Sequence, residues 1–575
     1  MLTDFSTMTD TLAAPAPTEV APPSRPYRRR SWAAVPAVLV PTVLFGLHAS
    51  LYGRWEVDDA GITFAYARSV AIGAGPVLQP GLPPVEGFSD PAWLALLVVG
   101  RWLGLFDHGT WFGVPDYVAY PKSLALVLVA GVFACFFAAA SAVSRRPAVV
   151  TVLAGCACAV IPSFVIWCVS GLENSLLALA TAGIATVLVR SGARDRLATP
   201  GPAVACGLLA ALAALTRPEG MIYAAAYPLA MLVLLRRGTW LRGLGSAVLA
   251  ALAFAVPYGA YLLWRWSTFH AWLPTTAVAK SQGLPTAAGF AKVSDLVAYA
   301  GWLAVLGGVL VVGAALGRRS PVRTAVVLVL VPLALALAAF GVLISDWMTQ
   351  YRFATPVWVL GSLVVGLAAV EVVGRLRLRG RAVVAVVVVV AAAVLSGIQW
   401  VAAARGYRAE PVAPMCLIVQ NTGREFNGYV EILGLRNPTL FAPEIGGAAL
   451  TGTSLLTDGA GLAEPTIARF WAAKDWAGVR NYVFDVVKPS FIRSHGQFRT
   501  QMAFDTDPRF VAGYVLIGPT PNGGGNWVRR DLVTGPEQMA RLQAWARQSL
   551  AADAAQRATP LASCGDRLTP GATTA

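Results

Sequence analysis

Apolar runs of about 20 residues recur along roughly the first 400 positions of the chain, and short polar segments separate them. A helix of that length crosses a hydrocarbon core of about 30 Å. The pattern therefore predicts a polytopic α-helical membrane protein with about eleven transmembrane helices. We place them at 33–53, 121–144, 148–168, 173–190, 202–216, 219–235, 244–265, 296–316, 321–344, 355–374 and 382–403. The shorter run 92–106 predicts a re-entrant or interfacial segment.

Beyond position 403 the chain becomes more polar and richer in Gly, Pro and Asn, which favour turns. Helix-like patterns near 464–476 and 535–552 lie among these turns. The stretch 404–575 has about 170 residues, which is an ordinary size for a domain. We therefore expect a C-terminal domain of mixed α/β character at 404–575, after a transmembrane domain at 33–403.

Composition excludes an ordinary soluble protein, because 56% of the residues are hydrophobic, only 13% are charged and the mean hydropathy is +0.61.

The formal net charge is +15, and the distribution of the basic residues along the chain indicates the membrane topology. Basic clusters occupy every second boundary of the predicted spans, at 25–30, 145–146, 190–196, 236–242, 318–319 and 375–381. Such clusters mark cytoplasmic loops. The stretch 1–32 is then a disordered cytoplasmic tail, the C-terminal domain is extracytoplasmic, and no nucleic-acid partner is expected.

The seven cysteines divide by location. Five lie in predicted spans, where cysteine usually serves as a small apolar residue. Cys416 and Cys564 lie in the outer domain, where an oxidising exterior permits a disulfide, although spacing alone does not establish its geometry. The sequence has no metal-type Cys/His cluster and no Gly-rich phosphate loop after a strand, so we name no metal ligand and predict no nucleotide-binding domain.

Two adjacent carboxylates, Asp58 and Asp59, directly follow the first predicted span. They lie in the stretch 55–68, next to an amphipathic segment that we expect on the membrane surface. Charge at such a position is costly unless it is hydrated or used. Glu86 and Asp90 add two carboxylates to the same outer loop, 54–120. An isolated pair here would simply be solvated, so the interpretation depends on the other outer-loop residues.

Three cations lie at comparable depth on the outer face: Arg217, Lys280 and Arg352. Each has a simpler explanation when it is taken alone. Arg217 can snorkel to the headgroups, Lys280 can be a solvated loop residue, and Arg352 can pair with Asp346. Together with the carboxylates they predict an outer cavity with cations at its floor. Cations can hold a phosphate leaving group, and a carboxylate can take the proton of an attacking hydroxyl.

Glu173 and Glu219 also lie at outer ends of spans, in Ser-Gly-Leu-Glu173-Asn and Thr-Arg-Pro-Glu219-Gly. Either carboxylate can instead compensate the macrodipole of the helix that follows it.

Three tryptophans of the outer domain, Trp471, Trp476 and Trp527, are candidate sugar platforms, and core packing is the simpler reading for each.

These motifs, in this order, resemble the multi-spanning GT-C glycosyltransferases, which use polyprenyl-phosphate sugars as donors. The resemblance covers most of residues 33–500. Within the superfamily, the chain is most similar to the mycobacterial terminal β-(1→2) arabinofuranosyltransferases of cell-wall arabinan. The motifs are Asp58-Asp-Ala-Gly-Ile-Thr-Phe-Ala-Tyr-Ala-Arg68, Gly73-x-Gly-Pro-Val77, Val85-Glu-Gly-Phe-Ser-Asp-Pro91, Ser170-Gly-Leu-Glu-Asn174, Thr216-Arg-Pro-Glu-Gly220, Leu273-Pro-Thr-Thr-x-x-Ala-Lys280, Tyr351-Arg-Phe353, Asp458-Gly-Ala-Gly-Leu-Ala-Glu-Pro-Thr-Ile-Ala-Arg469 and Pro489-Ser-Phe-Ile-Arg-Ser-His495.

The resemblance implies that Asp58 or Asp59 is the catalytic carboxylate. It favours Asp58, since the first aspartate of the pair matches the catalytic position, with Asp59 orienting it or contacting the acceptor. It also implies that the three cations bind the donor phosphate. The implied sugar or acceptor contacts are Glu86, Glu219, Glu173 and Tyr351. Before the loop lysine this chain has Ala277-Val278 where relatives often carry an aromatic or Thr-rich sequence, which leaves the sugar preference open.

The expected protein is thus a plasma-membrane glycosyltransferase with its active site at the outer face. The expected donor is a polyprenyl-phosphate sugar, with arabinofuranose as the expected sugar, and the expected acceptor is a cell-envelope glycan or glycolipid. With the family likeness, the many Ala, Val and Arg residues indicate an actinobacterial source. Relatives work with or without a divalent cation, so no cofactor is assigned.

Three questions stay open at this stage. A single carboxylate base readily explains inversion, whereas a β linkage built from a β-linked lipid phosphate requires retention. A lipid-linked glycan transporter or flippase is an alternative, although transporters place ionisable residues near the midplane and often show internal repeats. A non-catalytic envelope assembly protein is a second alternative, but an anchor has no need of matched cations.

Overall fold

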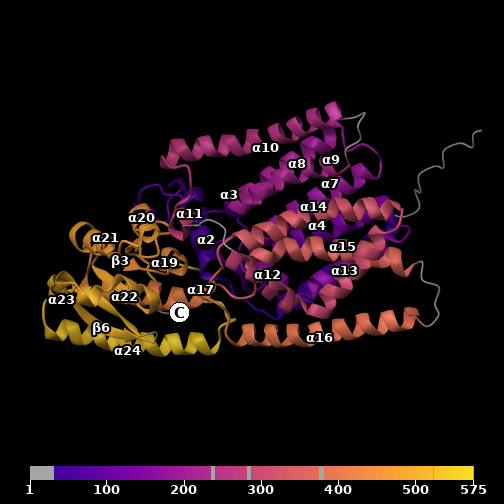
Figure 1. The fold of residues 1–575 in the computed structure, drawn as a ribbon. Coiled ribbons are helices and arrows are strands. Elements are labelled where there is room, and N and C mark those ends of the chain that lie inside the picture. The colour runs from indigo at the N-terminus through magenta and orange to yellow at the C-terminus, as the bar shows by residue number, and fades with distance from the viewer. Residues whose placement is uncertain (1–30, 235–239, 282–286, 375–380, 522, 574–575) are drawn as a thin grey trace, which may run out of the picture.

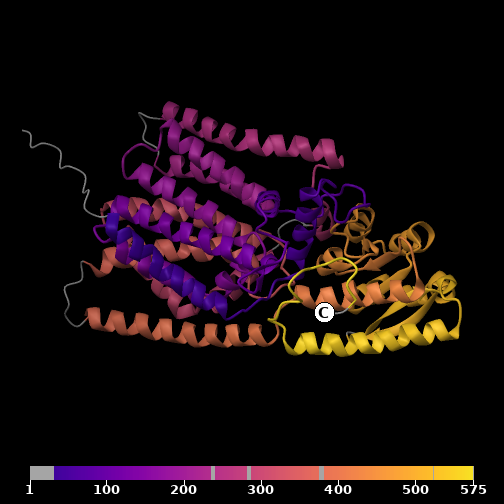
Figure 2. The ribbon, with the colours of Figure 1, turned by 180° about the vertical axis from the view of Figure 1, so that it is seen from behind.

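A computed structural model describes residues 31–234, 240–281, 287–374, 381–521 and 523–573. The predicted tail 1–32 lies almost wholly outside the described residues. The chain forms an elongated helical part, indigo to pink in Figure 1, and a C-terminal part of helices and strands, orange to yellow, at one end of it. Seen from behind in Figure 2, the C-terminus lies back near the junction of the two parts.

The helical part has helices at each of the predicted spans, although 148–168, 219–235 and 296–316 are each divided between two elements. Its elements are α1 (Ser31–Ser50), α2 (Asp58–Ala71), α3 (Pro91–Trp102), β1 (Thr110–Trp111), β2 (Val114–Pro115), α4 (Asp116–Val143), α5 (Pro147–Ala159), α6 (Pro162–Cys168), α7 (Asn174–Gly192), α8 (Pro200–Thr216), η1 (Pro218–Ala225), α9 (Ala226–Val233), α10 (Trp240–Phe269), α11 (Thr275–Lys280), α12 (Ala287–Ala300), α13 (Trp302–Leu316), α14 (Pro321–Val342), η2 (Arg352–Ala354), α15 (Thr355–Val373) and α16 (Arg381–Ala409).

Six of the described helices are long and apolar enough to cross a membrane. They are α1, α4, α7, α10, α14 and α15. The pairs α5/α6 and α12/α13, bent by 79° and 93°, raise the number to eight if each pair is one span. The chain is therefore a multi-pass membrane protein, whereas the count of about eleven remains a prediction. Two predicted spans are short in the structure: α8 has 17 residues, and 219–235 divides into η1 and the eight-residue α9.

The amphipathic segment that we expected on the membrane surface is instead a buried helix, α2. Ten of its 14 residues are buried, because α3 packs on one side and a helix of the C-terminal part, α19 (Gly446–Thr451), packs on the other. Gly61 makes this approach feasible, since a Cβ there would lie 2.8 Å from the carbonyl carbon of Gly446. The hydrophobic face of the segment is thus covered by protein, which the sequence pattern alone did not reveal.

The C-terminal part contains a five-stranded sheet in the order β4-β3-β5-β7-β6. β3 runs parallel to β4 and β5, whereas β7 runs antiparallel to β5 and β6. The helices expected near 464–476 and 535–552 correspond to α20 and α24. The elements are α17 (Met415–Ile418), η3 (Val419–Arg424), α18 (Glu425–Leu433), β3 (Thr439–Ala442), α19, β4 (Leu455–Asp458), α20 (Pro465–Ala473), α21 (Trp476–Asn481), η4 (Tyr482–Val487), β5 (Phe491–Ser494), α22 (Gly496–Met502), η5 (Phe504–Thr506), α23 (Pro508–Gly513), β6 (Tyr514–Thr520), β7 (Gly524–Arg529), η6 (Arg530–Leu532) and α24 (Pro536–Ala558).

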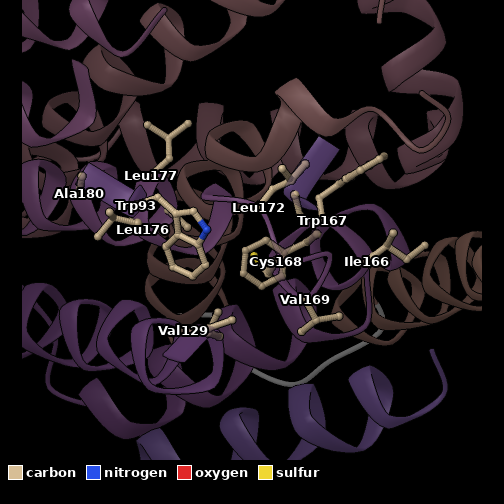
Figure 3. Close-up of a cluster of buried hydrophobic side chains, with 14 of the residues drawn as sticks. Trp93, Val129, Ile166, Trp167, Cys168, Val169, Leu172, Leu176, Leu177 and Ala180 are labelled. Atoms are coloured by element: carbon tan, nitrogen blue, oxygen red, sulfur yellow. The ribbon is translucent and has the colours of Figure 1, made fainter. Parts of the chain in front are cut away.

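The main hydrophobic core runs through the helical part and reaches the junction with the C-terminal part. Figure 3 shows one region of it, where Trp93 of α3 lies among side chains of α4, α6 and α7. The Trp93 indole N–H donates to the carbonyl of Gly171 at 2.9 Å, which fixes the turn between α6 and α7. A second core lies in the C-terminal part, where Trp527 is buried and Trp471 and Trp476 pack at the edge, as the simpler reading of these residues proposed.

Cys416 and Cys564 form a disulfide, with their Cα atoms 5.0 Å apart. The bond joins α17 to the segment after α24, across a sequence separation of 148 residues. That segment also contacts α4, because the hydroxyl of Tyr117 donates to the carbonyl of Gly565 at 3.0 Å. The end of the chain therefore links the helical part to the C-terminal part.

Candidate active site

A small polar cavity of about 50 Å³ is lined by residues of α2 and α11 and by the segment before α3. Its charged lining residues are Asp59, Asp90, Glu173, Arg217, Lys280 and Arg352. The three predicted cations therefore converge, although they come from separate loops between 217 and 352. The cavity is larger than the roughly 10–15 Å³ that a single water needs, so it can hold a small polar group.

Arg217 is fixed between two carboxylates. It ends α8 in an extended conformation, because Pro218 cannot continue the α-helical hydrogen bonds. Its guanidinium makes ion pairs with Glu173 and Glu219 and lies 4.7 Å from the ring centroid of Phe353. Two acceptors and an aromatic face together restrict the head group to one orientation.

Arg352 lies opposite, at the start of η2, and is only 4% exposed. Its Nε lies 2.9 Å from Oδ2 of Asp346, so the pairing that we considered in the sequence exists. Its Nη1 lies 3.7 Å from Oδ2 of Asp59. The second contact brings Arg352 into the cavity, so that pairing with Asp346 and a role at the site are compatible.

Lys280 is the last residue of α11, which packs against α20 of the C-terminal part. Lys280 is an exposed residue of the lining, and Arg352 lines the same cavity. The cation therefore reaches the cavity from a short helix that the C-terminal part supports.

The two aspartates of α2 face different surroundings. Asp59 lines the cavity, and its side chain is 25% exposed. Burial raises the pKa of Asp59, and the charges of Arg352 and Lys280 oppose this effect. Asp58 does not line the cavity and is 5% exposed. Adjacent residues of a helix point about 100° apart, so one of the pair faces the cavity and the other the C-terminal part.

Asp58 contacts the first residues of α19. Its Oδ2 accepts the amide N–H of Gly446 at 3.1 Å, and its Oδ1 accepts that of Gly447 at 2.7 Å. Burial raises the pKa of Asp58 to about 8, while the two amide donors oppose that rise. Each carboxylate oxygen retains a further lone pair for another donor.

Asp90 is a site residue that the sequence analysis counted in the loop without assigning it a role. It is 3% exposed, it precedes α3, and it accepts the hydroxyl of Thr63 at 3.2 Å. Burial, and then the charge of Glu173, raises the pKa of Asp90 to about 8. The spacing of Asp90 from the other carboxylates in the sequence does not indicate that it lies at the cavity, because the packing of α2 on α3 brings it there.

Two predicted substrate contacts, Glu86 and Tyr351, lie outside the cavity lining, and a third, Glu219, borders it only through Arg217. The Glu86 carboxylate is buried against Arg265, with Nε to Oε2 at 2.6 Å, and accepts the hydroxyl of Tyr261. Tyr351 packs edge-on against Tyr299, with ring centroids 5.2 Å apart. In the free protein Glu86 therefore braces the loop against α10, a role that the sequence did not suggest because Arg265 is 179 residues away.

A second and larger cavity, of about 460 Å³, lies beyond Asp58, between the end of α16 and the C-terminal part. Ala413 lines it, and the carbonyl of Ala413 accepts the amide N–H of Asp58 at 2.9 Å. Its lining includes apolar and polar residues: Trp347, Pro411, Pro414, Leu417, Asn421, Glu444, Arg493 and His495. Asp58 itself lines neither cavity: its neighbour Asp59 lines the small one, and its backbone partner Ala413 lines the second.

Among the residues that the structure describes, no group of three or more His, Cys, Asp or Glu side chains is placed to hold a metal ion. The carboxylates of the small cavity lie among cations, with Glu173 paired to Arg217 and Asp59 beside Arg352.

No protein-family model and no curated protein matches the chain. Solved structures do match. ArnT from Cupriavidus metallidurans matches at TM-score 0.53 and 16% identity when bound to undecaprenyl phosphate, over 88% of this chain and 100% of ArnT. The apo state of ArnT matches at TM-score 0.55 with the same identity and coverage.

Two other membrane transferases show weaker similarity. Archaeal oligosaccharyltransferase AglB from Archaeoglobus fulgidus, in complex with an inhibitory peptide and a dolichol-phosphate, has TM-score 0.49 and 12% identity, over 90% of this chain and 77% of AglB. Arabinofuranosyltransferase AftD from Mycobacteria has TM-score 0.45 and 14% identity, over 88% of this chain and 42% of AftD. The chain therefore shares the fold of ArnT.

Proposed function

We propose that the protein transfers a sugar from a polyprenyl-phosphate donor to a glycan or glycolipid acceptor at the outer face of a membrane. The observation that carries this proposal is the convergence of Arg217, Lys280 and Arg352 on one small polar cavity. The shared fold supports it, since ArnT was solved with undecaprenyl phosphate bound.

The cations of the small cavity are placed to bind an anion. Arg217, Lys280 and Arg352 line it together. Arg217 is paired with Glu173 and Glu219, and Arg352 with Asp346 and Asp59, so the two guanidinium groups are held in place. The donor phosphate would bind beside the three cations, which would stabilise the charge that builds on it as the sugar leaves.

We propose Asp58 as the general base and Asp59 as the aspartate that faces the donor. In an inverting displacement, the attacking hydroxyl and the leaving phosphate lie on opposite sides of the anomeric carbon. Asp59 lies beside the phosphate-binding cation Arg352, whereas Asp58 lies toward the second cavity. A pKa of Asp58 near 8 suits a base that must hold a proton briefly near neutral pH.

The second cavity is the proposed acceptor site. It combines apolar surfaces with Asn421, Glu444, Arg493 and His495, and His495 Nε2 lies 2.8 Å from Oε1 of Glu444. Sugars present both hydroxyls and apolar C–H faces, so a lining of this mixed kind suits a glycan. We propose that the acceptor hydroxyl approaches Asp58 from this side.

Further details of the function rest on the motif resemblance. We propose arabinofuranose as the sugar, a cell-envelope glycan or glycolipid of an actinobacterium as the acceptor, and a cytoplasmic N-terminus with the active site and the C-terminal part outside. The basic clusters between the spans support the orientation. Glu86, Glu173, Glu219 and Tyr351 remain proposed substrate contacts. Glu173, which lines the cavity, has the strongest support in the free protein.

The test is transfer from radiolabelled decaprenyl-phosphoryl arabinose to a synthetic arabinan by the purified protein. We expect transfer by the wild type and a loss of at least about tenfold in Lys280→Gln and Arg352→Gln. Arg436→Gln, which removes an exposed cation of the C-terminal part, is the matched control. Binding of polyprenyl phosphate without transfer would remove the arabinosyl assignment and keep the donor site. If the wild type neither binds nor transfers, the function proposed here is wrong, and flippase activity is measured next.

A further inference from the structure

The backbone just before Arg352 is in an unusual conformation. Gln350 and Tyr351 have φ values of +65° and +49°, so two consecutive non-glycine residues are left-handed. Side chains rarely adopt this region, and such residues persist only where their surroundings hold them. The turn places Arg352 at the start of η2, in contact with the cavity.

One carbonyl anchors this turn. The oxygen of Gln350 accepts the hydroxyl of Ser163 at 2.7 Å and the indole N–H of Trp167 at 2.9 Å. Both donors are fully buried, with exposed fractions of 1% and 0%. A third contact comes from α12, since the hydroxyl of Tyr299 donates to the side-chain oxygen of Gln350 at 2.7 Å.

The break between α5 and α6 makes this anchoring possible. The two helices meet at 79°, with Pro162 at the first position of α6. Ser163 and Trp167 are four residues apart, so they lie on the same face of the short helix. A straight continuation of α5 would carry them in a different direction, away from the carbonyl of Gln350.

Contacts from α6 and α7 also reach Arg352 itself. The guanidinium carbon of Arg352 lies 5.6 Å from the ring centroid of Trp167. The side-chain amide of Asn174 donates to the carbonyl of Arg352 at 3.1 Å and to the hydroxyl of Thr355 at 2.9 Å. Trp167 therefore contacts both the turn before Arg352 and the charged head group.

We propose that Ser163 and Trp167 are positioning residues for the donor-phosphate site, and that α6 is broken from α5 in order to hold them under Gln350. They touch no reacting atom; they act through Arg352. This inference rests on the proposed function, in which Arg352 binds the phosphate of the lipid donor. It assigns a role in donor recognition to a buried half-helix.

The test compares Ser163→Ala and Trp167→Phe with Thr181→Ala in the purified protein. Thr181 is a buried residue of α7 whose hydroxyl bonds only within its own helix among the described contacts, so it controls for the loss of a buried hydroxyl. We measure the KM for the donor, the KM for the acceptor, the inhibition constant of free polyprenyl phosphate, and thermal unfolding.

We expect Ser163→Ala and Trp167→Phe each to raise the donor KM and the inhibition constant of polyprenyl phosphate by about 10- to 100-fold, with the acceptor KM unchanged. Ser163→Thr keeps the hydroxyl and should restore much of the affinity. Gln350→Gly keeps the anchoring carbonyl and suits a positive φ, so it should bind donor nearly as well as the wild type.

Equal donor KM values in the wild type and both variants would overturn the inference, as would equal rises in the donor and acceptor KM. If Ser163→Ala or Trp167→Phe unfolds at a lower temperature than the wild type, the deciding measurement is the donor affinity of Gln350→Gly, which keeps the carbonyl. A low donor affinity in that variant shows that the side chain of Gln350 acts and not its anchored carbonyl, and the inference falls. A wild type that neither transfers nor binds polyprenyl phosphate refutes the proposed function instead.

Discussion

Gly446 donates its amide N–H to Oδ2 of Asp58 at 3.1 Å, and the two residues are so close that a Cβ on Gly446 would lie 1.9 Å from the carbonyl oxygen of Asp58. This contact joins α19 of the C-terminal part to the first turn of α2. The proposed base is thus held by two backbone amides of a different part of the molecule, and its orientation depends on a position without a side chain.

Gly446→Ala should therefore displace α19 from α2. The new methyl group meets backbone atoms, which cannot move away as a flexible side chain can, so we expect a destabilisation of about 1–3 kcal/mol. Transfer activity should fall more than the melting temperature suggests, because Asp58 loses its amide donors. Activity and thermal unfolding of the purified protein are the measurements.

Gly513→Ala is the matched control, since a Cβ there meets no atom within 4 Å and the residue does not have a positive φ. Gly513→Ala should change the transfer activity and the melting temperature only slightly. Full activity in Gly446→Ala would show that the close contact between α2 and α19 has no part in the reaction.

The two aspartates of α2 should differ in kinetics. Asp58→Asn removes the proposed base and should lower kcat by about 10²- to 10⁴-fold, with little change in the donor KM. Asp59→Asn removes the carboxylate beside Arg352 and should act mainly on the donor KM. The measurement is steady-state transfer with each substrate varied in turn.

The opposite pattern would identify Asp59 as the base. Because Asp59 lies on the phosphate side, that outcome would favour attack on the same face as the leaving group, and therefore retention. The anomeric configuration of the product, determined by NMR, separates the two courses independently of the kinetics.

The pH dependence follows from the raised pKa of Asp58, about 8 in the folded protein against about 3.9 in an unfolded chain. As a base, Asp58 must be ionised, so kcat should rise as the pH increases toward 8. Stability should change in the other direction. Between about pH 4 and 8 the folded state holds the proton that the unfolded state has released, so the contribution of Asp58 to stability is lost as pH rises.

Asp58→Asn isolates this effect, since the other carboxyl groups titrate in both proteins. The melting temperature of the wild type should fall relative to that of Asp58→Asn as pH rises from 5 to 8. A difference independent of pH would mean that the pKa of Asp58 is not raised.

Hydropathy and outer-loop spacing were sufficient to predict the multi-pass fold and the convergence of the three cations. Arg217, Lys280 and Arg352 each stand at the outer end of a helix, and helices that cross one membrane bring their outer ends to one level. Helices were also predicted at the positions of α20 and α24, whereas the disulfide between Cys416 and Cys564 was left open by the spacing.

Direction and pairing of side chains could not be predicted in the same way. Whether Asp58 or Asp59 faces the cavity depends on how α19 packs against α2, and α19 is 388 residues away from the pair. The burial of α2 and the pairing of Glu86 with Arg265 likewise arise from contacts between distant segments. Such contacts leave no periodic signal along the chain.

Glu86→Ala should destabilise the protein, because it leaves Arg265 charged and buried without its carboxylate. The expected loss is about 3–5 kcal/mol. Glu86→Leu combined with Arg265→Met removes both charges and should be less destabilised than Glu86→Ala alone. Glu537→Ala, at an exposed carboxylate of α24, is the control. A Glu86→Ala protein of normal melting temperature and high donor KM would instead support a direct substrate contact.

The disulfide between Cys416 and Cys564 closes a long stretch of chain, so its loss should be costly in the unfolding equilibrium. Cys416→Ser with Cys564→Ser should lower stability by about 2–5 kcal/mol. The segment after α24 would also be freed from α17, although the amide N–H of Arg54 still donates to the carbonyl of Leu561 at 2.8 Å. Thermal unfolding with and without a reducing agent gives the measurement.

A reducing agent should lower the melting temperature of the wild type to that of the double variant and leave the double variant unchanged, because the five free cysteines form no bond to reduce. Transfer should persist in the double variant at low temperature, since neither cysteine lines either cavity. If reduction destabilises both proteins equally, the stabilising bond is not the one between Cys416 and Cys564. If activity is lost while the protein stays folded, the C-terminal segment contributes to the position of α17 and, through Pro414 and Val57, of the aspartate pair.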